Sequence, residues 1–257
     1  VTDQSEPVIT LTGAATISIE QGSTYNDEGA TASDNVDGNI TANIVIVNNV
    51  NTAVAGIYTV TYNVSDIVLN AATEVVRTVT VTDDATLPVV TAPANITVAA
   101  TDANGTAASV AAIAAFLNGA TATDNVDTTL SITNNAPAIF PLGLTNVTFS
   151  ATDTAGNTGT ATATVTVTDQ SKPVITLLGA SSMTINVGDI FSDPGATASD
   201  NVDDDISLII QVGGIVDTGT VGLYTLTYNV SVCAGNTDFQ DTSRVSVPCG
   251  VATLCPT

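Results

Sequence analysis

The chain repeats itself three times, and this repetition limits its architecture more than any other feature of the sequence. The run Asp-Asn-Val-Asp, preceded by a Gly-Ala-Thr pattern, occurs at residues 34–37, 124–127 and 200–203. A second marker, Val-Thr-Asp followed closely by a proline, begins at Val1, Val81 and Val167. Self-similarity at such a period is typical of arrays in which each repeat is one folding unit. We therefore predict domains at residues 1–83, 84–169 and 170–247, followed by a Cys-containing tail at 248–257.

Within each repeat, short stretches alternate between apolar and small polar residues, as in a strand with one solvent-exposed face. In Tyr58–Val64 every second residue is apolar, and the pattern predicts that Tyr62, Phe149 and Tyr228 are equivalent core residues. Several such strands separated by Gly, Asn and Asp turns predict antiparallel β-sandwiches. The middle repeat is longer, and the apolar spacing in residues 109–117 predicts one short helix there.

Composition excludes several functions. The chain has 25 acidic and 3 basic residues, a net charge of −22, and no His. This charge argues against nucleic acid or an anionic membrane as partner and favours cations. The absence of His removes the commonest general base, so we expect no enzymatic activity. No apolar run is long enough to insert into a membrane.

Several motifs are similar to those of a known family. Pro-Val-Ile-Thr-Leu at residues 7–11 and 173–177, the Gly-Ala-Thr-Ala-x-Asp-Asn-Val-Asp run, Gly-x-Tyr-x-x-x-Tyr at 56–62 and Asp-Thr-Ala-Gly-Asn at 153–157 resemble bacterial immunoglobulin-like repeats. The middle repeat resembles the hyalin-repeat (HYR) type through residues 140–143 and 148–153. The resemblance implies an all-β chain of three tandem immunoglobulin-like antiparallel β-sandwiches in an extended array. It also implies an extracellular or cell-surface protein with a role in adhesion, spacing or assembly.

Acidic residues in separate loops form the candidate metal sites. In an immunoglobulin-like sandwich the N-terminal linker, the B–C loop and the F–G loop meet at one pole, and calcium prefers six to eight oxygen ligands from such loops. The predicted ligands are Asp3, Asp34, Asp37, Asp66, Asp83, Asp84, Asp124, Asp127, Asp153, Asp169, Asp200 and Asp203. The third cluster has Val232 in place of the F–G carboxylate, and Asp204 and Asp205 are candidates to compensate. The alternative is that these aspartates only cap their own turns.

Two further features concern contacts and cross-links. Ile67, Val68 and Leu69 place consecutive apolar residues at a hairpin tip, which predicts a contact with a neighbouring domain or chain. The alternative is that the tip folds back onto its own loop. Among the three cysteines, Cys249 and Cys255 are the predicted disulfide, which leaves Cys233 free or paired between chains.

These observations favour a stalk or spacer stiffened by calcium. The first alternative is a subunit of an extracellular filament held by contacts between immunoglobulin-like domains, and the second is a carbohydrate-binding module. The expected partners are other copies of the chain or neighbouring domains of a longer chain, with cell-surface or matrix glycans as a further class. Because Val1 falls inside a repeat linker, we expect the sequence to be a piece of a longer protein.

Overall fold

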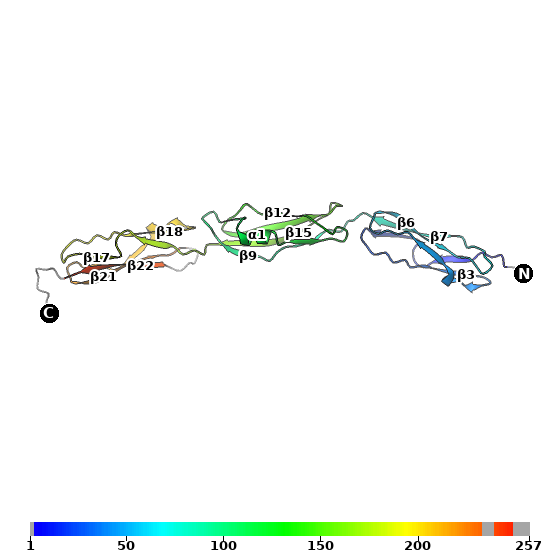
Figure 1. Ribbon diagram of the computed structural model, residues 1–257, viewed down its shortest axis with the longest axis horizontal. Coiled ribbons are helices and arrows are strands. Elements are labelled where there is room, and N and C mark those ends of the chain that lie inside the picture. Colours follow the sequence, from blue (N-terminus) through cyan, green and yellow to red (C-terminus); the bar gives the residue numbers. More distant parts are fainter. Residues whose placement is uncertain (1–2, 233–238, 249–257) are drawn as a thin grey trace. The chain divides into compact units, whose positions relative to one another are not determined.

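The computed structural model describes residues 3–232 and 239–248, and it contains three β-sandwich domains, one for each repeat (Figure 1). Packing contacts group the chain into two compact units. The first repeat lies wholly in one unit, the third lies in the other, and strands of the middle repeat contribute to both.

The first domain has a three-stranded sheet facing a four-stranded sheet. The smaller sheet has the order β1 (Val8–Leu11), β3 (Ala30–Asp34), β4 (Gly38–Asn39). The larger sheet has the order β2 (Thr16–Glu20), β7 (Val75–Thr82), β6 (Gly56–Asn63), β5 (Val45–Asn48). A short 3-10 helix at Thr41–Asn43 leads into β5. Ile9, Ala32, Ile40, Val60, Tyr62 and Val64 form the core between the sheets.

The third domain repeats this arrangement. Its smaller sheet has the order β16 (Val174–Leu177), β18 (Ala196–Asp200), β19 (Asp204–Asp205). Its larger sheet has the order β17 (Ser182–Thr184), β22 (Phe239–Val247), β21 (Gly222–Val230), β20 (Gln211–Gly213), with a 3-10 helix at Ser207–Ile209 before β20.

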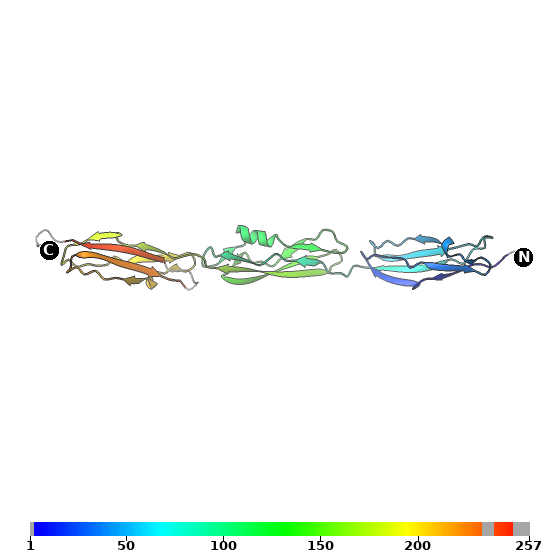
Figure 2. The same ribbon diagram turned by 90° about the horizontal axis from the view of Figure 1, so that it is seen from below.

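The middle domain has the same large sheet and additional small ones. Its four-stranded sheet has the order β12 (Ile132–Asn134), β14 (Gly143–Thr152), β15 (Thr158–Thr168), β9 (Ile96–Ala99). The two-stranded sheets pair β8 (Val89–Thr91) with β11 (Thr121–Thr123) and β10 (Thr106–Ala107) with β13 (Ile139–Phe140). Helix α1 (Ala111–Leu117), the green coil in Figure 2, lies within the segment of helical spacing. It buries Ile113 and Phe116.

One strand pair in each large sheet is parallel, although most of the pairing is antiparallel. In the first domain the chain leaves β1, turns at Gly13 with φ of 81°, and enters the opposite sheet as β2, parallel to β7. The same parallel pairing joins β9 to β15 and β17 to β22. A positive φ suits glycine, so this turn lets one N-terminal segment contribute to both sheets.

The predicted core residues are confirmed. Tyr62, Phe149 and Tyr228 are all buried on equivalent strands β6, β14 and β21. The two tyrosine hydroxyls still find acceptors, since Tyr62 donates to Asp27 and Tyr228 donates to Asp193. In the first domain the buried Arg77 also pairs with Asp27, whereas Ser243 stands at the corresponding place on β22.

Cys233 and the predicted Cys249–Cys255 disulfide lie outside the residues that the structure describes.

Candidate metal centres

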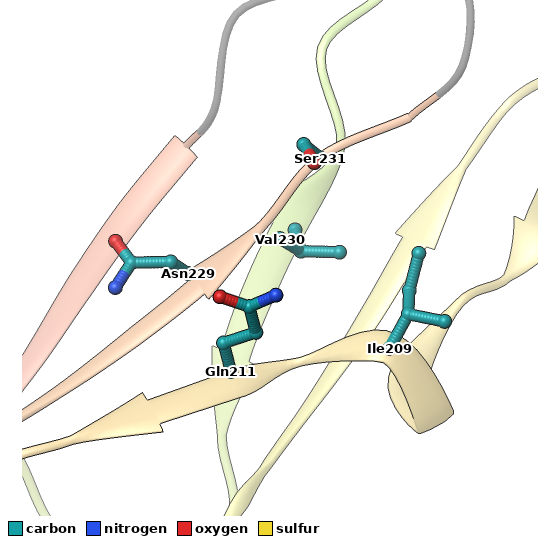
Figure 3. A pocket seen from close by; sticks show the side chains of 5 residues that line it. All are labelled: Ile209, Gln211, Asn229, Val230 and Ser231. Atoms are coloured by element: carbon teal, nitrogen blue, oxygen red, sulfur yellow. The ribbon is translucent and has the colours of Figure 1, made fainter.

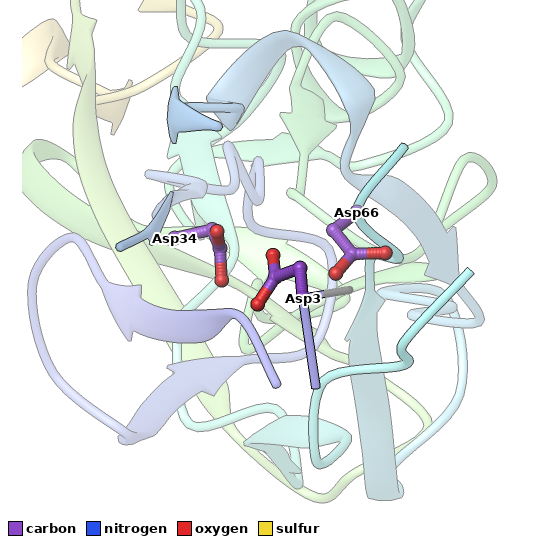
Figure 4. Close-up of side chains that lie close together, drawn as sticks. All are labelled: Asp3, Asp34 and Asp66. Atoms are coloured by element: carbon purple, nitrogen blue, oxygen red, sulfur yellow. The ribbon is translucent and has the colours of Figure 1, made fainter. Parts of the chain in front are cut away.

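Three loops of the first domain bring carboxylates together at one pole. Asp3 comes from the N-terminal linker, Asp34 ends β3, and Asp66 begins the turn after β6 (Figure 4). One carboxylate oxygen from each residue lies within 4.8 Å of the others. The loops are far apart in the sequence, and the sandwich topology places them together as predicted.

Each aspartate first stabilises its own loop. The Oδ1 atom of Asp34 accepts hydrogen bonds from the backbone N–H groups of Val36 and Asp37, at 2.7 and 3.0 Å. Asp66 binds the backbone and side-chain nitrogens of Asn70, both at 2.7 Å. The backbone hydrogen bonds to Asp34 lower the pKa of its carboxyl group, so it is held as the anion. Turn capping is therefore a real role of these residues.

Capping leaves one oxygen unused on several of them. The Oδ2 atoms of Asp3 and Asp34 are buried and have no hydrogen-bond partner among the described residues. Buried polar groups in native proteins are nearly always paired, so each exception needs a cause. Two unpaired anionic oxygens in one cluster also repel each other. A bound cation would satisfy both oxygens at once.

The middle domain has a second cluster, in which Asp127, the equivalent of Asp37, takes the place that Asp66 has in the first. Asp84, Asp124 and Asp127 each place one carboxylate oxygen within 4.8 Å of the others. Oδ2 of Asp84 and Oδ1 of Asp124 are buried without a partner, while the other oxygen of Asp124 accepts from Val126 and Asp127. Burial raises the pKa of the Asp84 carboxyl group despite its hydrogen bond from Thr86. A cation at this position would relieve that cost.

The third cluster contains Asp169, Asp200 and Asp203, again within 4.8 Å of one another. The Oδ2 atoms of Asp169 and Asp200 are buried and unpaired. Asp203 is exposed, and Val232 occupies the position that Asp66 and Asp153 hold in the other domains. The cluster has three carboxylates like the other two, but the pole around it has one carboxylate fewer because Val232 replaces the aspartate of the F–G turn.

The remaining predicted ligands support the clusters or lie beside them. Asp37 and Asp127 accept from the backbone of Ile67 and Thr154 at 2.8 and 2.9 Å, which ties the two loops of each pole together. Asp153 is buried and binds Asn157, as Asp66 binds Asn70. Burial would raise the pKa of Asp153, but its hydrogen bonds outweigh this and lower it.

Of the further candidate ligands, Asp83, Asp204 and Asp205 lie outside the clusters of described residues. Asp83 is exposed, whereas its neighbour Asp84 is buried in the second cluster. The signal that separates them is distance from the proline: Asp3, Asp84 and Asp169 all stand four positions before it. Asp204 and Asp205 form the short strand β19 instead, and Asp205 binds Ser207.

The hairpin tip of the first domain is exposed. Ile67, Val68 and Leu69 are 79%, 55% and 82% exposed, and Leu69 has a φ of 72°, a left-handed value that is uncommon for a residue other than glycine. The alternative that the tip folds back onto its own loop is therefore wrong. The predicted contact with a neighbouring domain or chain stays a prediction.

Comparison with known families assigns all three repeats. The family described as "Bacterial surface protein, Ig-like domain" matches residues 9–81 and 175–247, which is more than half of the chain. The chain belongs to this family of bacterial surface immunoglobulin-like domains. The HYR domain family matches residues 83–167, so the middle domain is of the HYR type. The resemblance to bacterial immunoglobulin-like repeats with an HYR-type middle repeat is confirmed, and so is the all-β tandem fold. The segment is an extracellular or surface repeat module.

Individual relatives are more distant. Hyalin from Lytechinus variegatus is 34% identical over 164 residues, which are 60% of this chain and 29% of that protein. The chain thus spans less than a third of this curated relative. A lipoprotein from Bacteroides thetaiotaomicron matches at a TM-score of 0.29 with 28% identity, over 32% of this chain and 40% of that one. The human CDH23 EC21-23 structure matches at a TM-score of 0.35 with 12% identity, over 94% of this chain and all 100% of that one.

Among the described residues, no helix has the length and apolar character needed to cross a membrane.

Proposed function

We propose that this segment is a non-enzymatic spacer module of an extracellular or cell-surface protein, and that calcium bound at the acidic poles stiffens the connections between its domains. The observation that carries the proposal is the pair of buried, unpaired carboxylate oxygens in each of the three clusters. The same arrangement occurs in domains of two types, so it does not depend on one local sequence.

The donor set suits calcium. All the candidate ligands are carboxylates on loops, and calcium takes six to eight oxygens in flexible geometry, including backbone carbonyls and water. The protein supplies no His, and the described clusters contain no Cys, so the softer ligands preferred by zinc or copper are missing from them. In the second cluster, Asp84, Asp124 and Asp127 would hold the ion, with Asp153 fixing the adjacent turn.

The location of Asp84 explains how an ion would stiffen the chain. Asp84 belongs to the linker between β7 and β8, while Asp124 and Asp127 belong to the middle domain. The same linker is already held from the other side, because the side chain of Glu20 in β2 accepts hydrogen bonds from Ala85 and Thr86 at 2.8 and 2.7 Å. Calcium at Asp84 would attach the linker to the middle domain as well, and this second attachment would restrict bending of the linker.

The carbohydrate-binding alternative has less support. Sugar-binding surfaces rely on exposed aromatic rings, and none of the described large hydrophobic side chains that are exposed is aromatic.

The direct test uses two adjacent aspartates that differ in burial. Asp84→Asn removes a ligand from the second cluster, and Asp83→Asn removes the same charge from an exposed neighbour. Isothermal titration with calcium should show that Asp84→Asn loses one binding event, whereas Asp83→Asn keeps all of them. Equal loss in both variants would indicate general charge attraction, and no calcium binding by the unmodified chain would reject the proposal.

A further inference from the structure

The strand β5 ends the large sheet of the first domain and has no partner on its outer side among the described strands. In an antiparallel pair, alternate residues direct their backbone N–H and C=O groups toward the partner and the others direct them outward. β5 therefore presents a row of backbone groups that another strand could pair with. Natural edge strands are usually protected by a charge, a proline or a bulge, but β5 reads Val-Ile-Val-Asn.

The apolar residues of β5 do not serve the core of their own domain. Val45, Ile46 and Val47 are 62%, 48% and 47% exposed, so both faces of the strand are open to solvent. The neighbouring β6 behaves differently, since Val60 and Tyr62 are fully buried. Three successive exposed apolar residues on an edge are typical of a contact surface.

The third domain repeats the feature. Its β20 ends the corresponding sheet, Val212 is 54% exposed, and Leu208 and Ile209 just before the strand are 101% and 51% exposed. A surface that recurs at the same place in two domains is more than a local irregularity.

A groove also lies beside the edge strand in both domains. In the third domain it is lined by Ile209, Gln211, Asn229, Val230 and Ser231 (Figure 3). Gln211 in β20 and Asn229 in β21 are cross-strand partners of each other. In the first domain the equivalent groove is lined by Asn43, Val45, Asn63, Val64, Ser65, Ala71 and Ala72. Amide side chains line both grooves, and that of Asn63 donates to the carboxylate of Glu74 at 2.9 Å.

The groove of the first domain is also continuous with the exposed hairpin tip. Ser65 and Ala71 line the groove and pair with each other at the base of the hairpin. Ile67, Val68 and Leu69 lie between them in the sequence. The edge strand, the groove and the tip thus offer apolar side chains and free backbone groups in one region.

Charge indicates which partner fits. The chain carries 25 acidic residues, yet residues 38–65, which include β5 and β6, contain no charged residue. Residues 128–152 of the middle domain and 206–216 of the third domain are also uncharged. Two copies of a chain with a net charge of −22 repel each other over most of their surface. They can approach at low electrostatic cost where an uncharged strand of one meets the same uncharged strand of the other.

We propose that β5 is a pairing surface for a second copy of this chain, joined antiparallel to the β5 of that copy. Such an interface uses the same patch on both copies and is closed by a two-fold axis. Main-chain hydrogen bonds across the joined edges provide the association, and the exposed valines and isoleucine pack against their counterparts.

The test measures self-association of the full chain by sedimentation velocity in a chelator, so that the result does not depend on the calcium proposal. The unmodified chain should form a dimer whose population rises with protein concentration. Ile46→Lys and Ile46→Glu should each weaken the dimer by about tenfold or more in Kd. The two variants change the net charge in opposite directions, so a general charge effect would move them apart. Val8→Lys, on an exposed edge of the other sheet, is the matched control and should leave the dimer unchanged.

Hydrogen exchange supplies a second readout. The backbone amides of Val45–Asn48 should become more protected as the dimer forms, while those of β1 should not change. The proposal is overturned if the unmodified chain stays monomeric at all accessible concentrations. It is also overturned if the dimer forms without protection of β5, or if Val8→Lys disrupts it as strongly as the Ile46 variants do.

Discussion

At the scale of the residue, Asp34 shows how capping and metal binding can share one side chain. Its Oδ1 accepts two backbone hydrogen bonds, and its Oδ2 is buried without a partner. The two interpretations of the aspartates are therefore compatible. The loops are ordered by one oxygen of each residue, and that order holds the other oxygens in position to share an ion.

The buried Arg77 gives the first domain a stability requirement that the third domain lacks. Its guanidinium group pairs with Asp27 and donates to the carbonyls of Ala14 and Gly29 at 3.0 and 3.2 Å. Arg77→Ser, which copies the residue at position 243, should lower the unfolding free energy of the first domain by about 3–5 kcal/mol because Asp27 loses its cation. Hydrogen exchange of the β6 and β7 amides measures this domain separately.

The matched control for that substitution is Arg244→Ser, since Arg244 is exposed. It should change the stability of the third domain by no more than about 0.5 kcal/mol. A loss of similar size in both variants would show that the buried pair with Asp27 is not the cause.

Tyr228 predicts an alkaline limit for the third domain. Burial and the hydrogen bond to Asp193 raise its pKa from the ordinary 10.0 to about 12. A folded-state pKa above the unfolded value favours the neutral phenol, so the contribution to stability is complete below pH 10 and is lost as the pH rises from 10 through about 12. Urea unfolding at about pH 9 and about pH 11.5 should show the loss. Tyr228→Phe should show a weaker pH dependence, because only the part from Tyr62, whose pKa is also raised by burial, remains. An identical pH dependence in both proteins would contradict the assignment.

At the scale of the element, the sequence predicted the alternating strands, the helix α1 and the loops that share a pole. Each of these features depends on local periodicity or on the equivalence of the repeats. The alternation in Tyr58–Val64 placed Tyr62 in the core, and the spacing in residues 109–117 indicated α1. The choice of Asp84 over Asp83 needed the distance to the proline rather than the distance from Val-Thr. The burial of Arg77 could not be predicted, because an arginine in an alternating strand usually faces solvent. The exposure of both faces of β5 also depends on how the sheets end, which no local pattern contains.

The turn at Val232 offers a gain-of-function test. Val232 stands where Asp66 and Asp153 stand in the other domains, so the third pole has one carboxylate fewer than the first two and should bind calcium more weakly. Val232→Asp should raise the calcium affinity of the third site, because calcium affinity in such loops rises with the number of carboxylates. Val212→Asp, an exposed position on β20, adds the same charge elsewhere and serves as the control. An equal gain in both variants would contradict a specific fourth ligand.

At the scale of the whole molecule, the acidic composition and the repeat architecture belong to one account. A net charge of −22 keeps separate copies and separate poles apart. A divalent cation would reduce the repulsion between carboxylates at each acidic cluster. Two chains would meet the least electrostatic repulsion at their uncharged strands. The proposed calcium sites would act along the chain, and the proposed edge pairing would act between chains.

The most direct measurement of the central claim is small-angle scattering of the full chain with calcium and with a chelator, at equal ionic strength so that general screening is matched. The account predicts a radius of gyration that changes on chelation and a broader distribution of interatomic distances, because the linker that contains Asp84 loses one of its two attachments. Asp84→Asn should show part of this change even in calcium. An unchanged radius of gyration, together with no calcium found by metal analysis, would contradict the account and leave the aspartates as turn caps.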